Sequence, residues 1–297
     1  MADTGSASHM TCNREAFDDY VESRVPRENS SGLGKGIATL KVWNGSKWQK
    51  FVFKNVKMAA KADFNIISIH KILKRGWWCV FSRGTVTILN SKEKVYMVGK
   101  LSKYYKVFVF FVGGDTLDEE PLPIAPPIRV FPSIDFQSIL ANYHIIKFPS
   151  YIICDSGASI NTIRNRKYFI NYVRYKVPSI IQTPDGMMEI IGEGSVKFLT
   201  YNGDKWSIQE LLCGHMIDEN TDIEVISIPF ADKYSECDTY CNSKYLAYVN
   251  RKRNLVKITG LFVHGHWMFV GVKIPADMAL LPLKQLKKIF LSMNITK

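Results

Sequence analysis

The sequence predicts a mainly β protein with two tandem, small β-barrel domains, a proline-rich linker between them and a short C-terminal helix. Three observations lead to this fold class. Short runs rich in Val, Ile, Phe, Tyr and Thr alternate with Gly, Asn-Gly and Asp-Gly turns. The chain repeats itself, and an acidic stretch with several prolines separates the two repeats.

The repeat is visible in three registers that follow one another along the chain. An offset of 152 residues aligns Asp3 with Asp155 and matches Asn13, Arg14, Phe17, Tyr20, Val21, Val25 and Pro26 to identical residues. After a gap the offset is 158, which places "NGSKW" at 44–48 on "NGDKW" at 202–206. One further residue of slip aligns "IISI" at 66–69 with "VISI" at 225–228. We therefore predict two diverged copies of one domain.

The repeat and the composition suggest four segments. Residues 1–113 form the first copy and residues 148–275 the second. Residues 114–147 join them: the stretch 115–133 contains prolines that resist both helix and central strand, and residues 134–143 are expected to form a short helix. Residues 276–297 form a tail with an amphipathic helix after Pro282, whose apolar positions are Leu283, Leu286, Ile289, Phe290 and Met293.

Within each copy the β signals are short and closely spaced. The expected strands of the first copy are "KGIATLKVW", "KWQKFVFKNV", "GTVTILN" and "KVFVFFV". Those of the second copy are "MMEIIGEG", "SVKFLTY", "KWSIQELL" and "GHWMFVGVKI". Such spacing is typical of a small closed barrel or a sandwich in each copy.

Composition and charge indicate which classes of partner the protein could have. The net charge is +12 and the pI about 9.3, but the basic residues are spread along the chain, so nucleic-acid binding is possible and not favoured. It would need a cluster on one face, such as Lys284, Lys287 and Lys288 with Arg251, Lys252 and Arg253. The longest apolar burst, residues 107–112, is too short to span a bilayer, so no membrane partner is expected.

The six cysteines follow no disulfide spacing and no signal segment opens the chain, so we expect an intracellular, cytoplasmic protein. Cys237 and Cys241, followed by His264 and His266, invite a zinc site because thiolate and imidazole are the usual ligands. Cys-x3-Cys with His-x-His is not a strong ligand spacing, however. Ordinary strand and loop residues are the favoured reading, with no metal and no cofactor.

Two acidic turns carry the chemistry. Asp155-Ser156-Gly157 follows the apolar run "SYIIC", and Asp3-Thr4-Gly5 recurs at the head of the other copy. Two carboxyl groups held close together cannot both ionise cheaply and so share a proton. One can then act as base on a bound water while the other donates to a scissile carbonyl. Two copies related by an approximate two-fold axis would bring the two aspartates together.

These turns resemble the protease region of copia-type LTR-retrotransposon Pol polyproteins. That family has Asp-Ser-Gly-Ala-Ser, as at 155–159, and a His-Met-Thr-like triplet, as at His9-Met10-Thr11. The later order is similar too, with an Asp-Gly turn, a Gly-x-Gly strand and a Lys-x-Gly stretch such as "KILKRGWWCVF". The resemblance covers most of both copies, about 3–112 and 151–273.

The resemblance implies a retropepsin-like aspartic endopeptidase that acts as a dimer on a Gag-Pol-like precursor, with virus-like particles as one setting. It implies that Asp155 and Asp3 are the catalytic acids, and that "IISI" and "VISI" pass beneath them. The residues implied to brace the turns are Ser156, Gly157, Thr4 and Gly5, and those implied to form a substrate-binding flap are Pro184, Asp185 and Gly186.

The first copy departs from the family pattern in two places. Only Met1 and Ala2 precede Asp3, which predicts an N-terminally truncated copy with a weakly positioned acid. The segment between Pro26 and Gly34 is six residues shorter than the corresponding segment between Pro178 and Gly192, which predicts a short flap. Two pairings therefore stay open, Asp3 with Asp155 in one chain or Asp155 with Asp155 of a second chain. The competing hypothesis is an inactive transposon-derived barrel that binds protein or has no function.

Overall fold

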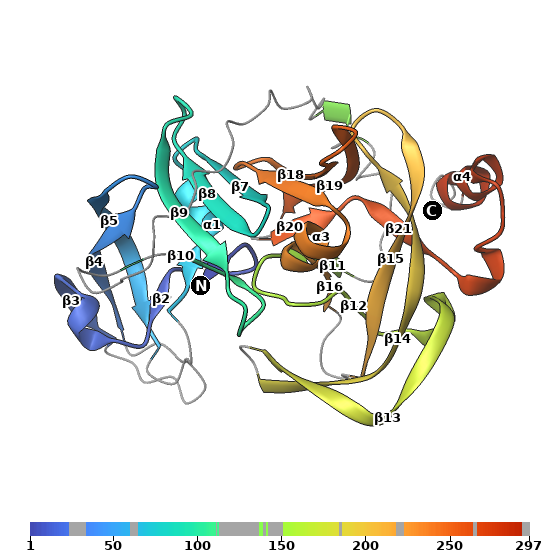
Figure 1. The fold of residues 1–297 in the computed structure, drawn as a ribbon, viewed down its shortest axis with the longest axis horizontal. Coiled ribbons are helices and arrows are strands. Elements are labelled where there is room, and N and C mark those ends of the chain that lie inside the picture. Colours follow the sequence, from blue (N-terminus) through green and yellow to red (C-terminus); the bar gives the residue numbers. More distant parts are fainter. Residues whose placement is uncertain are drawn as a thin grey trace.

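The computed structural model describes residues 1–23, 34–59, 65–110, 112, 137–138, 141, 151–183, 186–217, 223–263 and 266–292. These residues form a mainly β protein with a few short helices, as the sequence predicts. We call residues 1–110 the N-terminal half and residues 151–292 the C-terminal half. Figure 1 shows the two halves side by side, with helix α4 at the far end of the C-terminal half.

The N-terminal half begins with a two-stranded parallel sheet and a four-stranded sheet. In the first, β1 (Ala2–Asp3) pairs with β6 (Ile67–Ser68). The second has the order β2-β5-β4-β3, from β2 (Met10–Thr11), β3 (Asp19–Glu22), β4 (Gly34–Trp43) and β5 (Trp48–Met58). The helix α1 (Ile69–Leu73) and the antiparallel strands β7 (Trp78–Ser82), β8 (Thr85–Leu89), β9 (Val95–Leu101) and β10 (Phe108–Phe110) follow.

The C-terminal half has longer strands. They are β11 (Tyr151–Asp155), β12 (Thr162–Ile163), β13 (Phe169–Thr183), β14 (Gly186–Tyr201), β15 (Trp206–Ile217) and β16 (Ile223–Ser227). The helix α3 (Ile228–Tyr234) leads to β17 (Cys237–Cys241), β18 (Tyr245–Asn250), β19 (Leu255–Val263), β20 (His266–Phe269) and β21 (Gly271–Ile274). The chain then forms α4 (Leu283–Ser292).

One sheet crosses from one half to the other. Its order, β10-β9-β8-β7-β17-β18-β19-β20-β11-β16-β12-β15-β14-β13, joins the halves at the antiparallel pair β7–β17. No sheet in the described ranges closes on itself, so the expected pair of closed barrels is wrong for this part of the chain. The strands β7 to β10 and β17 to β20 lie edge to edge instead, because pairing β7 with β17 satisfies an edge that each half would otherwise expose.

The same local structure occurs at residues that are 152 apart. Asn13 and Asn165 each cap a 3-10 turn, at Arg14–Ala16 and Arg166–Tyr168, by accepting a backbone N–H hydrogen bond. Arg14 lies 3.9 Å from the ring centroid of Tyr20, and Arg166 lies 4.1 Å from that of Tyr172. The sequence repeat is therefore matched by repeated geometry.

The predicted C-terminal helix is confirmed as α4. Leu286 is fully buried against a small apolar cluster that includes Leu199 and Trp206, so the helix is held by packing on β14 and β15. Met293 lies outside the described residues. None of the helices that the structure describes is long and apolar enough to cross a membrane.

Several elements differ from the sequence expectation. "MMEIIGEG" and "SVKFLTY" form the single strand β14, and "GHWMFVGVKI" contains two strands that pair with different partners, β20 with β19 and β21 with β14. The helices α1 and α3 and the strands β17 to β19 were not expected. The predicted linker and lead-in, 114–147, lies outside the described residues except for Gln137, Ser138 and Ala141, which are helical.

Candidate active site

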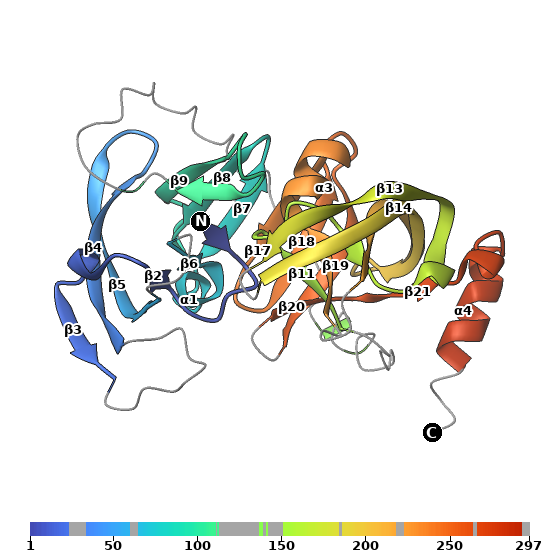
Figure 2. The same ribbon diagram turned by 90° about the horizontal axis from the view of Figure 1, so that it is seen from below.

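Asp3 and Asp155 are the last residues of β1 and β11, and the dark blue start of the chain lies close to β11 in Figures 1 and 2. Each strand runs parallel to a second one, with Asp3 opposite Ser68 and Asp155 opposite Ser227. The expectation that Asp3 is weakly positioned is wrong. Ala2 is completely buried and Asp3 is 5% exposed, and β1 pairs with β6 as β11 pairs with β16.

The two carboxyl groups lie close together. A Cβ atom placed on Gly157 would be 3.3 Å from Asp155 Oδ1 and 3.4 Å from Asp3 Oδ2, so both carboxyl groups border one small space. A Cβ atom on Gly5 would lie 3.0 Å from Asp155 Oδ2. The distances of 3.3 Å and 3.0 Å to Asp155 are shorter than nearly all real Cβ contacts, which favours glycine after the hydroxyl residue in each turn.

The hydroxyl residues of the two turns exchange four hydrogen bonds. Thr4 Oγ1 donates to the carbonyl oxygen of Cys154 at 3.1 Å, and Ser156 Oγ donates to that of Ala2 at 2.9 Å. In return, the Ser156 N–H donates to Thr4 Oγ1 at 2.8 Å and the Thr4 N–H to Ser156 Oγ at 3.0 Å. Because each hydroxyl bonds both the backbone before the other acid and the backbone after it, the two acids are locked in one relative position.

Replacing Ser156 by Ala removes half of this exchange and should lower the free energy of unfolding by about 1–3 kcal/mol, because the Thr4 N–H and the Ala2 carbonyl lose their partner in a buried site. Urea denaturation measures the change. The matched control is Ser159→Ala, two residues beyond the turn, for which we expect a loss below about 0.5 kcal/mol. Equal losses in the two variants would contradict the proposed bracing role of Ser156.

A second pair of hydrogen bonds supports each turn, from Ser68 of β6 for the first turn and from Ser227 of β16 for the second. Ser68 Oγ donates to the carbonyl of Ser6 at 2.6 Å, and Ser227 Oγ donates to that of Ala158 at 2.7 Å. The N–H of Ser68 donates to His9 Nδ1 at 3.0 Å, while the N–H of Ser227 donates to Asn161 Oδ1 at 2.8 Å. Burial lowers the pKa of His9 to about 3, helped by the charges of Lys71 and Arg75, so the ring is neutral and its Nδ1 can accept.

These supporting residues were not assigned a role from the sequence. The signal was present, however, since His9 and Asn161 are related by the same offset of 152 as the two acids. Ser68 and Ser227 likewise occupy the same place in "IISI" and "VISI". The expectation that these strands pass beneath the acids agrees with the β1–β6 and β11–β16 pairings.

The two acids differ in their surroundings. Asp155 Oδ1 accepts hydrogen bonds from the N–H groups of Gly157 at 2.8 Å and Gly5 at 3.2 Å, and from Thr4 Oγ1 at 3.4 Å. Asp3 Oδ1 accepts one from the Ser6 N–H at 2.8 Å. Burial and then the nearby charge of Asp155 raise the pKa of Asp3 to about 8. The raised pKa of Asp3 favours its protonated form at neutral pH, and Asp155 is the acid that accepts the larger number of hydrogen bonds.

The predicted flap is described only in part. Pro184 and Asp185 lie outside the described residues, and Gly186 begins β14. The strands β13 and β14 form an antiparallel hairpin whose last pair is Thr183 opposite Gly186. The predicted short flap of the first copy, between Pro26 and Gly34, also lies outside the described residues. Within the described ranges, no group of three or more His, Cys, Asp or Glu side chains could hold a metal ion.

Comparison with known families bears on the N-terminal half. Residues 1–77 match the family described as "Pol polyprotein, beta-barrel domain". The match includes Asp3, Thr4 and Gly5 and ends just before β7, so it supports a Pol-derived N-terminal region and does not reach Asp155. No curated protein and no solved structure matches the chain.

Proposed function

We propose that this protein is a retropepsin-like aspartic endopeptidase of the copia type, in which Asp3 and Asp155 of one chain form the catalytic pair. The observation that carries the proposal is the set of four hydrogen bonds that the Thr4 and Ser156 hydroxyls make across the two turns, which fixes two carboxyl groups beside one another. Two acids on the protein surface would not need hydrogen bonds that fix their relative position. It is expected where two carboxyl groups must share one proton.

The proposed reaction uses the different protonation of the two acids. Asp155, as carboxylate, takes a proton from a bound water while the water oxygen bonds to the scissile carbonyl carbon. Asp3, which carries the proton at neutral pH, donates it to the carbonyl oxygen. The tetrahedral intermediate then breaks its C–N bond, and the proton that Asp155 gained passes to the leaving amine. As the carbonyl group re-forms, one hydroxyl proton of the intermediate returns to Asp3, which restores the starting protonation of the pair. One water is consumed, and the products are a carboxylic acid and an amine.

The register of the β7–β17 pair favours pairing of Asp3 with Asp155 within one chain over pairing between two chains. The β7–β17 pair places Val80 opposite Tyr240 and Phe81 opposite Thr239. At an offset of 159 residues, Val80 corresponds to Thr239 and Phe81 to Tyr240. Each of the two residues therefore pairs with the counterpart of the other, as expected for two copies related by a two-fold axis. We therefore interpret the halves as tandem copies that form a pseudo-dimer, with the acids near the axis.

The hairpin of β13 and β14 is the proposed cover of a bound peptide. Its outward apolar side chains include Val177, which is 78% exposed, and Ile180, which is 60% exposed. Exposed aliphatic side chains on a strand pair can contact an extended peptide, whose backbone lies along the strands. We propose a polypeptide substrate of the Gag-Pol precursor kind.

The test is cleavage of a quenched fluorescent peptide library by the purified chain between pH 4 and pH 9. We expect cleavage that is inhibited by pepstatin-like compounds and abolished by Asp155→Asn. The rate should fall as pH rises through about 8, because Asp3 then loses the proton that it must donate. Ser159→Ala is the control for handling and purity. Absence of cleavage at every pH, with the chain folded, would overturn the proposed activity.

A further inference from the structure

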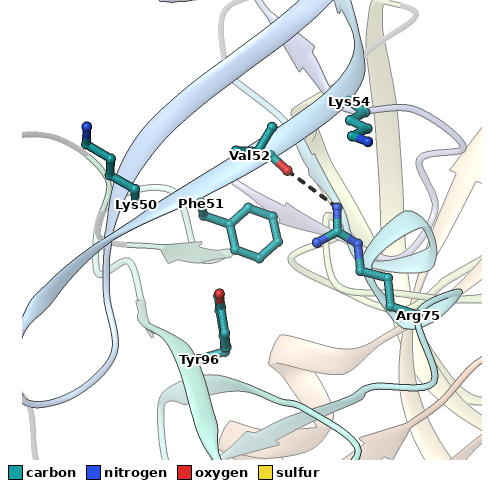
Figure 3. Close-up of a pocket in the computed structure, with 6 residues that line it drawn as sticks. All are labelled: Lys50, Phe51, Val52, Lys54, Arg75 and Tyr96. Carbon is teal, nitrogen blue, oxygen red and sulfur yellow. Dashed lines mark hydrogen bonds between the residues drawn. The ribbon is translucent and has the colours of Figure 1, made fainter.

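The N-terminal half carries a basic pocket that the proposed peptidase activity does not use. Its volume is about 530 Å³, and it is lined by Lys50, Phe51, Val52, Lys54, Arg75 and Tyr96. Figure 3 shows the ring of Phe51 between the side chains of Lys50 and Arg75, with Tyr96 on the facing strand. None of these residues belongs to the two acidic turns.

The surrounding sequence is strongly basic. Residues 34–110 contain 16 Lys and Arg residues and 2 acidic residues, an excess greater than the net charge of +12 of the entire chain. Of the acidic side chains at 15–22, Glu15 lies in the 3-10 turn Arg14–Ala16, and Asp19 and Glu22 lie in β3, which β4 separates from β5 in the sheet order β2-β5-β4-β3. The strand β5 carries Lys50, Lys54 and Lys57, and the turn after α1 carries Lys74 and Arg75.

The strand pairing places like charges opposite one another. Lys41 faces Lys50 and Lys35 faces Lys57 across the β4–β5 pair, an arrangement that destabilises a sheet. In the part of the chain that the structure describes, Lys50 and Lys54 form no ion pair. Opposed lysines of this kind are suited to a polyanionic ligand.

The pocket combines this charge with flat rings. The guanidinium carbon of Arg75 lies 5.0 Å from the ring centroid of Phe51 and 5.7 Å from that of Trp77. Trp77 and Tyr96 are half-exposed, with ring centroids 4.6 Å apart. Aromatic rings and an Arg guanidinium plane are the surfaces on which unpaired bases stack.

One edge of β5 is also open at the pocket. The strand β2 pairs with β5 only at Lys57 and Met58, so the opposite edge from β4 carries no described strand between Trp48 and Val56. There Arg75 Nη2 donates to the carbonyl oxygen of Val52 at 3.4 Å, as Figure 3 shows. Arg75 is thus held against this edge of β5, beside the lysines and the rings.

From this combination we infer that the pocket binds single-stranded nucleic acid, with Lys50, Lys54 and Arg75 near phosphates and a base against Tyr96. Duplex nucleic acid is disfavoured because its bases are stacked on one another and cannot reach the rings. The inference is independent of the proposed peptidase activity, since no residue of the acidic turns takes part.

The experiment is fluorescence anisotropy of a labelled 20-nucleotide single strand, RNA or DNA, with the full chain at 50–300 mM salt. We expect binding that weakens steeply with salt. The variant Lys50→Glu/Lys54→Glu should reduce the slope of log K against log salt by about 1.4, at about 0.7 for each lost phosphate contact. Tyr96→Leu should raise Kd by about five-fold or more, from the loss of one stacked base.

The matched control is Lys205→Glu/Lys284→Glu, which makes the same change in net charge on exposed residues of the C-terminal half. It should leave the salt slope within error of the wild type. An equal loss of binding in the control, equal binding of heparin or of duplex DNA, or no binding at 50 mM salt would each overturn the inference. Circular dichroism of every variant confirms that the fold is kept, and Asp155→Asn should bind as the wild type does.

Discussion

Replacing Asp3 by Asn is expected to lower the peptide-cleavage rate by about 10²–10⁴-fold, the usual contribution of a positioned general acid. Asp3 carries the raised pKa of about 8 and therefore the proton that the proposed reaction donates. An amide of the same shape keeps the hydrogen bond from the Ser6 N–H but cannot supply that proton. Initial rates at pH 5–7 with saturating peptide measure the effect.

This variant also separates the two ways in which the acids could pair. If Asp155 paired with Asp155 of a second chain, Asp3→Asn would retain activity. If the pair forms within one chain, Asp3→Asn and Asp155→Asn are both inactive, and mixing them restores nothing, because each chain then contains only one intact acid of its own pair. Recovery of activity on mixing would contradict the single-chain pair.

The second large effect is on stability. Replacing Lys273 by Met should lower the free energy of unfolding by about 3–5 kcal/mol. Its ammonium group pairs with the carboxylate of Glu224, and the two side chains are only 6% and 1% exposed. The Arg164 N–H also donates to Glu224, at 3.1 Å. Without Lys273, a buried carboxylate loses its cation, and β16, which carries Ser227 beneath Asp155, loses part of its support.

Urea denaturation at pH 7 measures this loss. The matched control is Lys252→Met, which breaks the ion pair with Glu236, whose side chains are 75% and 53% exposed. We expect less than about 1 kcal/mol there. The double variant Lys273→Met/Glu224→Gln should recover part of the stability, since no uncompensated charge stays buried. A loss as small as that of the control would show that the buried pair contributes no more than a surface one.

The sequence predicted the parts of the site that the repeat makes visible. Asp3 and Asp155, the hydroxyl residues after them and the strands beneath them were all found because corresponding residues recur in the same order in both copies, at offsets of 152 and 159. The Asn-Gly signals also marked the turns between β4 and β5 and between β14 and β15. Such features are local, and a short stretch of sequence is enough to specify them.

The parts that the sequence missed depend on contacts between distant segments. The support of Asp3 comes from β6, more than 60 residues away, so two residues of β1 suffice where a longer strand was expected. The helices α1 and α3 have only 5 and 7 residues, too few for a helical period to be recognised. The joining of β7 to β17 is set by two free sheet edges, which no local pattern reveals.

The shared sheet also determines how a substrate would reach the acids. Separating the halves would break the β7–β17 ladder and the four hydrogen bonds of the Thr4 and Ser156 hydroxyls at once. A clamshell opening of the whole molecule would therefore be costly. In the proposed enzyme, movement of the β13–β14 hairpin would then be the less costly route by which a peptide reaches the acids.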